Sequence, residues 1–193
     1  MAPVARLCSR NANKLRELRA ALPGWQIELL PLRVASLGAD KYPPEEGESY
    51  YENARAKADF GRTLELELWL IGEDSGIEVD GLGGGPGVHS ARFGGDDPVG
   101  CLLAELHGVE GDGRRARYVC ELVALSPGGE EHRGTGVLEG RIAHEAHGSE
   151  GFGYDPIFVP DGEERTVAEL GNEWKRTNSH RARAATALGA AVG

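Results

Sequence analysis

The sequence has few of the residues that mark several protein classes. Its three cysteines, Cys8, Cys101 and Cys120, are widely spaced and show no metal-ligand pattern, which predicts inert core thiols in a reducing compartment. No apolar run approaches the roughly 20 residues that a membrane-spanning helix needs. The first residues also lack the basic and apolar regions of a signal peptide. We therefore expect a cytoplasmic protein that makes no use of a membrane.

Positive charge is also scarce. The chain has 21 basic and 31 acidic residues and a formal net charge of −10, which argues against a nucleic-acid partner because phosphate backbones bind basic surfaces. A small phosphorylated ligand needs only a few local cations and remains possible. Only four of the basic residues are lysines, namely Lys14, Lys41, Lys57 and Lys175. A lysine ammonium is a point charge that phosphate sites use, so each of these four is a candidate contact.

The composition otherwise describes an ordinary globular protein. Hydrophobic residues make up 40% and charged residues 27% of the 193 positions, enough chain to bury a core. No linker, repeat or low-complexity segment divides it, so we expect a single domain spanning residues 1–193. The 29 glycines are about twice the usual ~7% share and predict many loops and turns.

One stretch stands out, because two acids follow an apolar run. Residues 68–71 predict a buried strand that ends at Glu73-Asp74-Ser75-Gly76. Ligands of open α/β sheets bind beyond the carboxyl ends of strands, where such acids serve as a metal ligand or general base. The glycine-rich run 83–87 and Ser90-Ala91-Arg92 follow, and backbone without Cβ lets a ligand approach closely. For the four residues alone, a solvated turn is the alternative.

The first segment of the chain predicts a strand, a polar loop and a helix. Val4–Cys8 is short and apolar, Ser9–Lys14 is polar, and the leucines after it recur at helical spacing until about Leu22. Free N–H groups at a helix start, together with Lys14, form an anion site. The loop is not a Walker A motif, so an ordinary strand–helix turn is the alternative.

A second helix begins at a capping box, Ser49-Tyr-Tyr-Glu52, and runs to about Gly61. Asn53 and Lys57 are four residues apart and therefore stacked on one face, where they suit two oxygens of a phosphate chain. A surface lysine is the alternative for Lys57. The acidic segment 45–48 just before this helix is either solvated or lends one carboxylate to a metal.

Two long strands are predicted after an amphipathic helix at 98–107. The first covers residues 114–125 and the second covers 131–141, with Pro127-Gly128-Gly129 as the hairpin turn between them. Gly134 and Gly136 interrupt the second strand and suggest bends or bulges.

The last third of the chain contains features suited to a nucleobase. Residues 151–156 place the ring of Phe152 on a tight glycine loop, where it can stack on a base, and Asp155 can accept from a base N–H. A core aromatic in a turn is the alternative. Ser179 is a predicted N-cap, so His180 and Arg181 fall in the first helical turn. The helix dipole disfavours cations there, which suggests that both residues face an anionic or carbonyl-like group.

Five blocks, in this order, closely resemble the inosine/xanthosine triphosphate pyrophosphatase family: SRNANKLREL, SYYENARAKA, EDSGIEVDGLGGGPGVHSARF, GFGYDPIF and EWKRTNSHRARA. Members of this family hydrolyse non-canonical purine nucleoside triphosphates to the monophosphate and pyrophosphate. The resemblance implies an α/β fold in which a long, twisted, mixed sheet is flanked by helices that form two lobes with a central cleft. It further implies a homodimer and dependence on Mg²⁺.

The resemblance also implies roles for particular residues. Asp74 is the catalytic carboxylate and a metal ligand, with Glu45 or Glu73 as the second metal carboxylate. The residues that contact the triphosphate are Ser9, Arg10, Asn11, Ala12, Asn13, Lys14, Asn53 and Lys57, with Ser75 as a further substrate contact. The residues that form the nucleoside pocket are Phe152, Gly153, Tyr154, Asp155, Lys175, His180 and Arg181.

Two positions depart from the family pattern. Arg10 replaces a glycine of the first loop, which costs strain if that glycine has positive φ, although an arginine can instead add a phosphate contact. Glu73 stands where aspartate is usual, so the role of that acid is in question. Three other interpretations compete: a Maf-like pyrophosphatase of pyrimidine or modified nucleotides, a non-catalytic nucleotide sensor, and a nucleic-acid-binding module that uses the C-terminal arginines.

Overall fold

The computed structural model describes residues 3–31 and 45–193. Six strands form one sheet in the order β2-β1-β3-β4-β5-β6, with β1 parallel to β2 and β3 and the pairs from β3 to β6 antiparallel. The sheet is therefore mixed, and the predicted α/β class is confirmed; the two lobes remain a prediction. The strands are β1 (Val4–Cys8), β2 (Gln26–Leu29), β3 (Trp69–Val79), β4 (Arg115–Leu125), β5 (Glu131–Ile142) and β6 (Phe158–Pro160).

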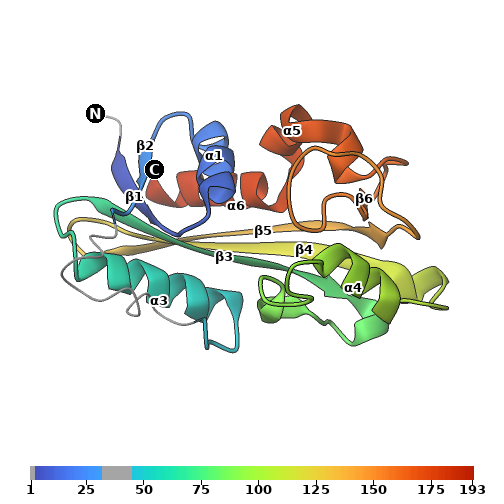
Figure 1. Cartoon of the computed structure of the whole chain (residues 1–193). Helices are drawn as coiled ribbons and strands as arrows, with labels where there is room; N and C mark the ends of the chain where they lie inside the picture. Colours follow the sequence, from blue (N-terminus) through green and yellow to red (C-terminus); the bar gives the residue numbers. More distant parts are fainter. Residues whose placement is uncertain (1–2, 32–44) are drawn as a thin grey trace.

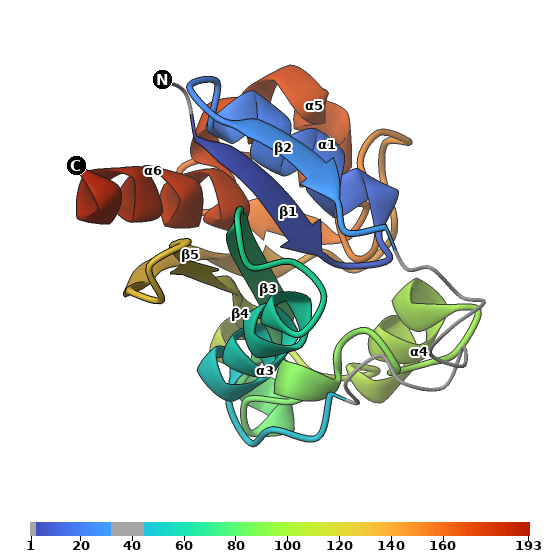
Figure 2. The same cartoon turned by 90° about the vertical axis from the view of Figure 1, so that its left-hand side faces the viewer.

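Helices cover both faces of the three long strands. α1, α5 and α6 lie on one face and α3 and α4 on the other, as Figures 1 and 2 show from two directions. Among residues 3–31 and 45–193, no helix is long and apolar enough to span a membrane. The helices are α1 (Ala12–Ala21), α3 (Tyr50–Arg62), α4 (Pro98–Glu105), α5 (Val167–Asn178) and α6 (His180–Val192).

Side-chain caps fix where the helices of the site begin. The Asn11 side chain accepts from the backbone N–H of Asn13 at 2.9 Å, so α1 starts directly after the first loop. Ser49 forms the predicted capping box at the start of α3, and Ser179 caps α6. Both cap predictions are confirmed, and each cap satisfies backbone donors that have no partner inside the helix.

The prediction that the strand ends at the two acids is wrong. β3 continues to Val79 and pairs with β4 along its whole length, because residues 77–79 alternate as a strand does. The parallel neighbour β1, however, ends at Cys8, opposite Gly72. Glu73 and Asp74 therefore still lie just beyond the carboxyl end of a parallel strand, where α/β sheets bind ligands.

The two acids point to opposite faces of the sheet, because side chains alternate along a strand. On one face, Ile71 packs in the core cluster shared with α1 and α6, and Glu73 contacts Arg181. On the other face, Leu70 packs against α3, and Asp74 contacts that helix as well. One strand thus supplies a carboxylate to each layer of helices.

The prediction of bulges at Gly134 and Gly136 is also wrong. The β4–β5 pairing is continuous from Arg115 opposite Arg141 to the end of the hairpin. A Cβ at Gly134 would lie 2.2 Å from a backbone oxygen of α6, and one at Gly136 would lie 2.0 Å from the His180 oxygen. These glycines allow α6 to approach the sheet closely and so set the position of the residues at its first turn.

Candidate active site

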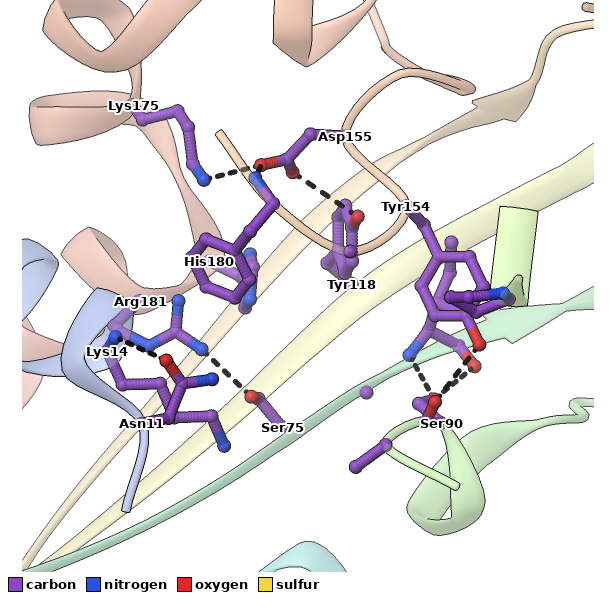
Figure 3. Close-up of a pocket in the computed structure, with 16 residues that line it drawn as sticks. Asn11, Lys14, Ser75, Ser90, Tyr118, Tyr154, Asp155, Lys175, His180 and Arg181 are labelled. Carbon is purple, nitrogen blue, oxygen red and sulfur yellow. Dashed lines mark hydrogen bonds and ion pairs between the residues drawn. The ribbon is translucent and has the colours of Figure 1, made fainter. Parts of the chain in front are cut away.

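A cavity of about 250 Å³ opens beside β3, and every residue of the predicted nucleoside pocket lines it (Figure 3). It is lined by residues of β3, β4, the first loop, the glycine loop 151–155 and the α5–α6 junction. Predicted residues in its wall are Asn11, Lys14, Ser75, Phe152, Gly153, Tyr154, Asp155, Lys175, His180 and Arg181. Ser90 and Ala91, which follow the glycine-rich run, also line it, and residues that the sequence did not indicate are Gly76, Ile77, Pro98 and Tyr118.

His180 is a buried, stacked residue of the cavity wall. Its ring stacks on Tyr118 with centroids 4.5 Å apart and an interplanar angle of 9°. Burial, and then the neighbouring Arg181, hold the pKa of His180 well below its usual value, so the imidazole is neutral at pH 7. Within the described part of the chain, its buried Nδ1 has no hydrogen-bond partner. His180 therefore lines the cavity as a neutral ring that has one N–H donor and one nitrogen acceptor.

Asp155 is fixed by three donors. Its carboxylate accepts from Lys175 Nζ at 2.6 Å, from the Phe152 backbone N–H at 2.8 Å and from the Tyr118 hydroxyl at 3.3 Å. Burial raises the pKa of Asp155, and Lys175 acts in the opposite direction. A Cβ at Gly151 would lie 2.1 Å from Asp155 Oδ2, which explains why the loop needs glycine there.

Phe152 has the partly exposed ring that the stacking prediction requires. Lys175 Nζ lies 4.5 Å and Arg181 Cζ 5.7 Å from the ring centroid, within the range of cation–π attraction. The ring therefore lines the cavity next to one cation of α5 and one of α6.

Glu17 of α1 is a functional residue that sequence reasoning missed. It forms ion pairs with Lys175, at 2.5 Å, and with Arg181. Arg181 also donates to Glu73 at 2.8 Å, and Glu73 pairs with Lys14 at 2.5 Å. Charges of alternating sign thus run without a break from the nucleoside pocket to the first loop. The only sequence signal was Glu17 on the same helix face as Lys14, three residues away.

Arg181 mainly binds other side chains of the protein. It contacts Glu17 and Glu73, and its Nη2 also donates to Ser75 Oγ at 2.9 Å. The structure thus confirms that this residue of the first turn of α6 faces anions, and the anions belong to the protein itself.

A second cavity, of about 570 Å³, adjoins the first. It shares Asn11, Lys14 and Ala91 with the nucleoside pocket. Its wall consists of Ser9, Arg10, Asn11, Ala12, Lys14, Glu45, Lys57 and Ala91. Asn13 and Asn53 are absent from both walls, whereas the other residues predicted to contact the triphosphate line this cavity.

Lys57 is the centre of a cluster between α3 and β3. Its buried ammonium lies 2.8 Å from Asp74 Oδ1 and 2.6 Å from Glu45 Oε1, and it donates to the Glu73 backbone oxygen at 3.0 Å. Burial opposes its charge, but the three carboxylates of Asp74, Glu73 and Glu45 outweigh burial and raise the pKa of Lys57. The alternative of a surface lysine is therefore wrong.

The pKa of Asp74 is raised as well, but from a different cause. Burial raises its pKa, and Lys57 only partly offsets this effect. Asn53 donates from Nδ2 to Asp74 Oδ2 at 3.0 Å, while Asn53 Oδ1 accepts from the Gly47 N–H at 2.9 Å. Asn53 therefore orients Asp74 and the acidic segment.

The donor set suits a magnesium ion only in part. Over residues 3–31 and 45–193, no group of three or more His, Cys, Asp or Glu side chains is arranged to hold a metal. Mg²⁺ commonly takes only one or two carboxylates, with waters and phosphates completing its shell. Asp74 and Glu45 fit that requirement, because their two negative charges exceed the single positive charge of Lys57, which contacts both. Glu73 does not fit, because it is fully buried and both its oxygens pair with cations.

A mixed sheet that places a base-sized cavity next to a cavity of lysines and carboxylates is the arrangement expected of an α/β protein that acts on a phosphorylated nucleoside. Comparison with known proteins is more specific. The chain belongs to the Ham1 family, whose model matches residues 5–191.

Relatives align with the chain along almost its whole length. The dITP/XTP pyrophosphatase of Bdellovibrio bacteriovorus is 40% identical over 190 residues, which cover 94% of this chain and 94% of that protein. The dITP/XTP pyrophosphatase of Symbiobacterium thermophilum is 45% identical over 185 residues, covering 92% and 89%.

Solved structures agree with this assignment. A HAM1 protein from Coxiella burnetii superposes with a TM-score of 0.82 at 30% identity and covers 98% of both chains. The nucleoside-triphosphatase / dITP/XTP pyrophosphatase of Mycobacterium abscessus gives a TM-score of 0.73 at 40% identity over 96% of this chain and 97% of that one.

Proposed function

We propose that this chain hydrolyses non-canonical purine nucleoside triphosphates, such as ITP, dITP and XTP, to the monophosphate and pyrophosphate. The observation that carries the proposal is the continuity of the two cavities: the one with the neutral His180 shares Lys14 with the one that contains Lys57. The relatives named as dITP/XTP pyrophosphatases support it. The proposal treats residues 1–193 as one catalytic domain.

In this proposal the base lies in the first cavity and the phosphates in the second. Asp74, ionised and oriented by Asn53, accepts a proton from the water that attacks the α-phosphate. Lys14 and Lys57 face the negative charge that grows toward the leaving pyrophosphate. Lys175 was expected to share that task, but its ammonium is bound to Asp155 and Glu17 in the first cavity, so we assign it to base recognition.

Mg²⁺ is the cofactor that the proposal includes. Asp74 and Glu45 would hold it, and when bound it neutralises charge on the phosphate oxygens. Glu73, the acid that departs from the family pattern, has a different task here: it keeps Lys14 at the cavity wall and anchors Arg181.

Discrimination of a 6-oxo purine from adenine follows from hydrogen-bond donors. The tautomer of neutral His180 whose N–H faces the cavity can donate to the oxygen at position 6, whereas an adenine amino group would confront that donor with another donor. Arg181 retains little donor capacity for the base, since Glu17, Glu73 and Ser75 occupy most of it. His180 is therefore the direct discriminator in this proposal.

The proposed function is tested by measuring initial rates of pyrophosphate release, with Mg²⁺, from ITP, XTP, dITP, ATP, GTP and the pyrimidine triphosphates. We expect kcat/KM for ITP and XTP to exceed that for ATP and GTP. Binding of ITP without turnover would instead identify a nucleotide sensor, and a preference for pyrimidine or modified nucleotides would identify a Maf-like enzyme.

His180→Ala is expected to lower the preference for ITP over ATP about tenfold, because one hydrogen bond to a charged or polar partner is worth about 1–1.5 kcal/mol. The preference is measured as the ratio of the two kcat/KM values. His144→Ala is the control, since that imidazole is exposed and lies outside both cavities. An unchanged ratio in His180→Ala would show that the base is recognised elsewhere.

A homodimer in the cytoplasm completes the proposal, as the resemblance to the family implies. The protein's mass in solution, measured by light scattering at several concentrations, tests the dimer. A mass near the 20.6 kDa of one chain would contradict it.

A further inference from the structure

The acidic segment that presents Glu45 is held to the rest of the protein at three points. The Glu48 and Ser49 N–H groups donate to the Glu52 carboxylate of α3, and the Gly47 N–H donates to Asn53 Oδ1. The third contact comes from a residue outside α3. Arg92 Nη2 donates to the backbone oxygen of Glu45 at 2.8 Å.

The Arg92 contact bears directly on the catalytic cluster. Glu45 is the residue whose main chain Arg92 holds and whose side chain reaches Lys57 Nζ at 2.6 Å. Lys57 in turn contacts Asp74. Glu45 ionises more readily than a free glutamate: burial opposes this, but Lys57 above all, with Lys14 and Arg92, lowers its pKa.

The backbone that carries Arg92 is itself firmly placed. Two residues earlier, the Ser90 backbone oxygen accepts from the Tyr154 hydroxyl at 3.0 Å, and Ser90 Oγ accepts from the Ile77 N–H of β3 at 2.9 Å (Figure 3). Residues 90–92 therefore connect the loop of the nucleoside pocket, the central strand and the acidic segment.

Arg92 acts on the acidic segment through one nitrogen. Its Nη2 donates to the Glu45 backbone oxygen and lies 3.2 Å from His89 Nδ1. Its neighbour Ala91 lines both cavities, whereas Arg92, like Asp74, belongs to neither wall. An exposed hydrogen bond of this kind contributes little to stability, and its main effect is to fix the position of Glu45.

We propose that Arg92 is a positioning residue for catalysis, which holds the Glu45 carboxylate against Lys57 and Asp74 through the Glu45 main chain. The inference rests on the proposed function for the task of Glu45, which is to share a divalent cation with Asp74. Residues that orient metal-binding side chains commonly change metal affinity by about 10–100-fold when they are replaced.

A double-mutant cycle tests this inference. Wild type, Arg92→Met, Glu45→Gln and the double variant are compared in two ways: binding of Mn²⁺ alone, followed by electron paramagnetic resonance, and the Mg²⁺ dependence of pyrophosphate release from ITP. We expect Arg92→Met to weaken Mn²⁺ binding and raise the Mg²⁺ requirement about tenfold, with KM for ITP at saturating Mg²⁺ little changed. In the Glu45→Gln background the same replacement should have no further effect.

Two more variants keep the test specific. Arg92→Lys retains a donor and should recover part of the Mn²⁺ affinity. Arg183→Met is the matched control, because Arg183 is also an exposed arginine that donates to a backbone oxygen, that of Val137 at 2.7 Å, but far from Glu45 in the sequence and outside both cavities. It should behave as wild type does.

Three results would overturn the inference while the proposed function stands: active Arg92→Met with unchanged Mn²⁺ affinity, effects that add fully to those of Glu45→Gln, or a selective rise in KM for ITP. Fully additive effects would mean that Arg92 acts independently of Glu45. A selective rise in KM would mean that Arg92 contacts the substrate directly. Absence of pyrophosphate release from ITP by the wild-type enzyme would instead contradict the proposed function itself.

Discussion

Asp74→Asn is expected to lower kcat for ITP by about 10²–10⁴-fold, the range typical of a lost general base. An asparagine keeps the size of the side chain, but its single oxygen can accept from Lys57 or from Asn53 and not from both, and it cannot take a proton from water. Because Glu45 remains next to Lys57, the ammonium keeps one partner, and the fold should persist. Kinetics with ITP at saturating Mg²⁺, alongside a circular-dichroism melt, measure both effects.

The pH profile provides a second readout for Asp74. Burial raises the pKa of this carboxyl above its ordinary value of 3.8, so the active, ionised form should be lost on acidification at a higher pH than for a free aspartate. Asp80→Asn is the control, since Asp80 is exposed just beyond the same strand. If Asp74→Asn retained kcat within about threefold of wild type, well outside the range expected for a lost base, the base would have to be another group.

Local patterns in the sequence predicted the parts of this fold that depend on neighbouring residues. The capping box at Ser49, the cap at Ser179 and the strand at Val4–Cys8 are confirmed because each depends on residues a few positions apart. The end of β3 was misjudged because two acids in mid-strand are tolerated only when other elements neutralise them, and here Lys57 and Arg181 do so from opposite faces.

The same distinction applies to the site. The residues that line the two cavities were predicted largely through resemblance to a family, whereas their mutual contacts were not. Glu17 and Tyr118 escaped notice, since their importance comes from partners more than 30 residues away: Glu17 with Lys175 and Arg181, Tyr118 with Asp155. The sequence also did not show why residue 136 is a glycine, because the reason is the close packing of α6, whose backbone a Cβ at this position would clash with.

Glu73→Gln is expected to reduce the free energy of unfolding by about 3–5 kcal/mol, the usual cost of breaking a buried ion pair from one side. Glu73 is fully buried and is the common partner of Lys14 and Arg181, so its loss removes that partner from Lys14 and leaves Arg181 with Glu17 alone. Urea unfolding at pH 7 measures the effect. Glu78→Gln is the matched control on the same strand: its ion pair with the exposed Arg117 should contribute at most about 1 kcal/mol.

The stability gap between wild type and Glu73→Gln should depend on pH in a definite direction. Although burial favours the protonated acid, Lys14, Arg181 and Lys57 hold the pKa of Glu73 well below its ordinary value of 4.5. A carboxyl with a lowered pKa stabilises the folded state fully above its unfolded pKa and loses that effect as pH falls toward the folded value. The gap should therefore be constant at neutral pH and narrow below pH 4.5.

Glu73→Asp tests the charge of the side chain separately from its length. The family commonly has aspartate at this position, but here the longer side chain contacts Lys14 and Arg181 at once. Aspartate keeps the charge and shortens the arm by one methylene, so we expect a smaller loss of stability than for glutamine and the same narrowing at low pH. A gap for Glu73→Gln that stayed constant down to pH 3 would mean that packing, not charge, is what Glu73 supplies. In that case the arrangement of the side chains from Asp155 to Lys14 would not depend on the charge of Glu73.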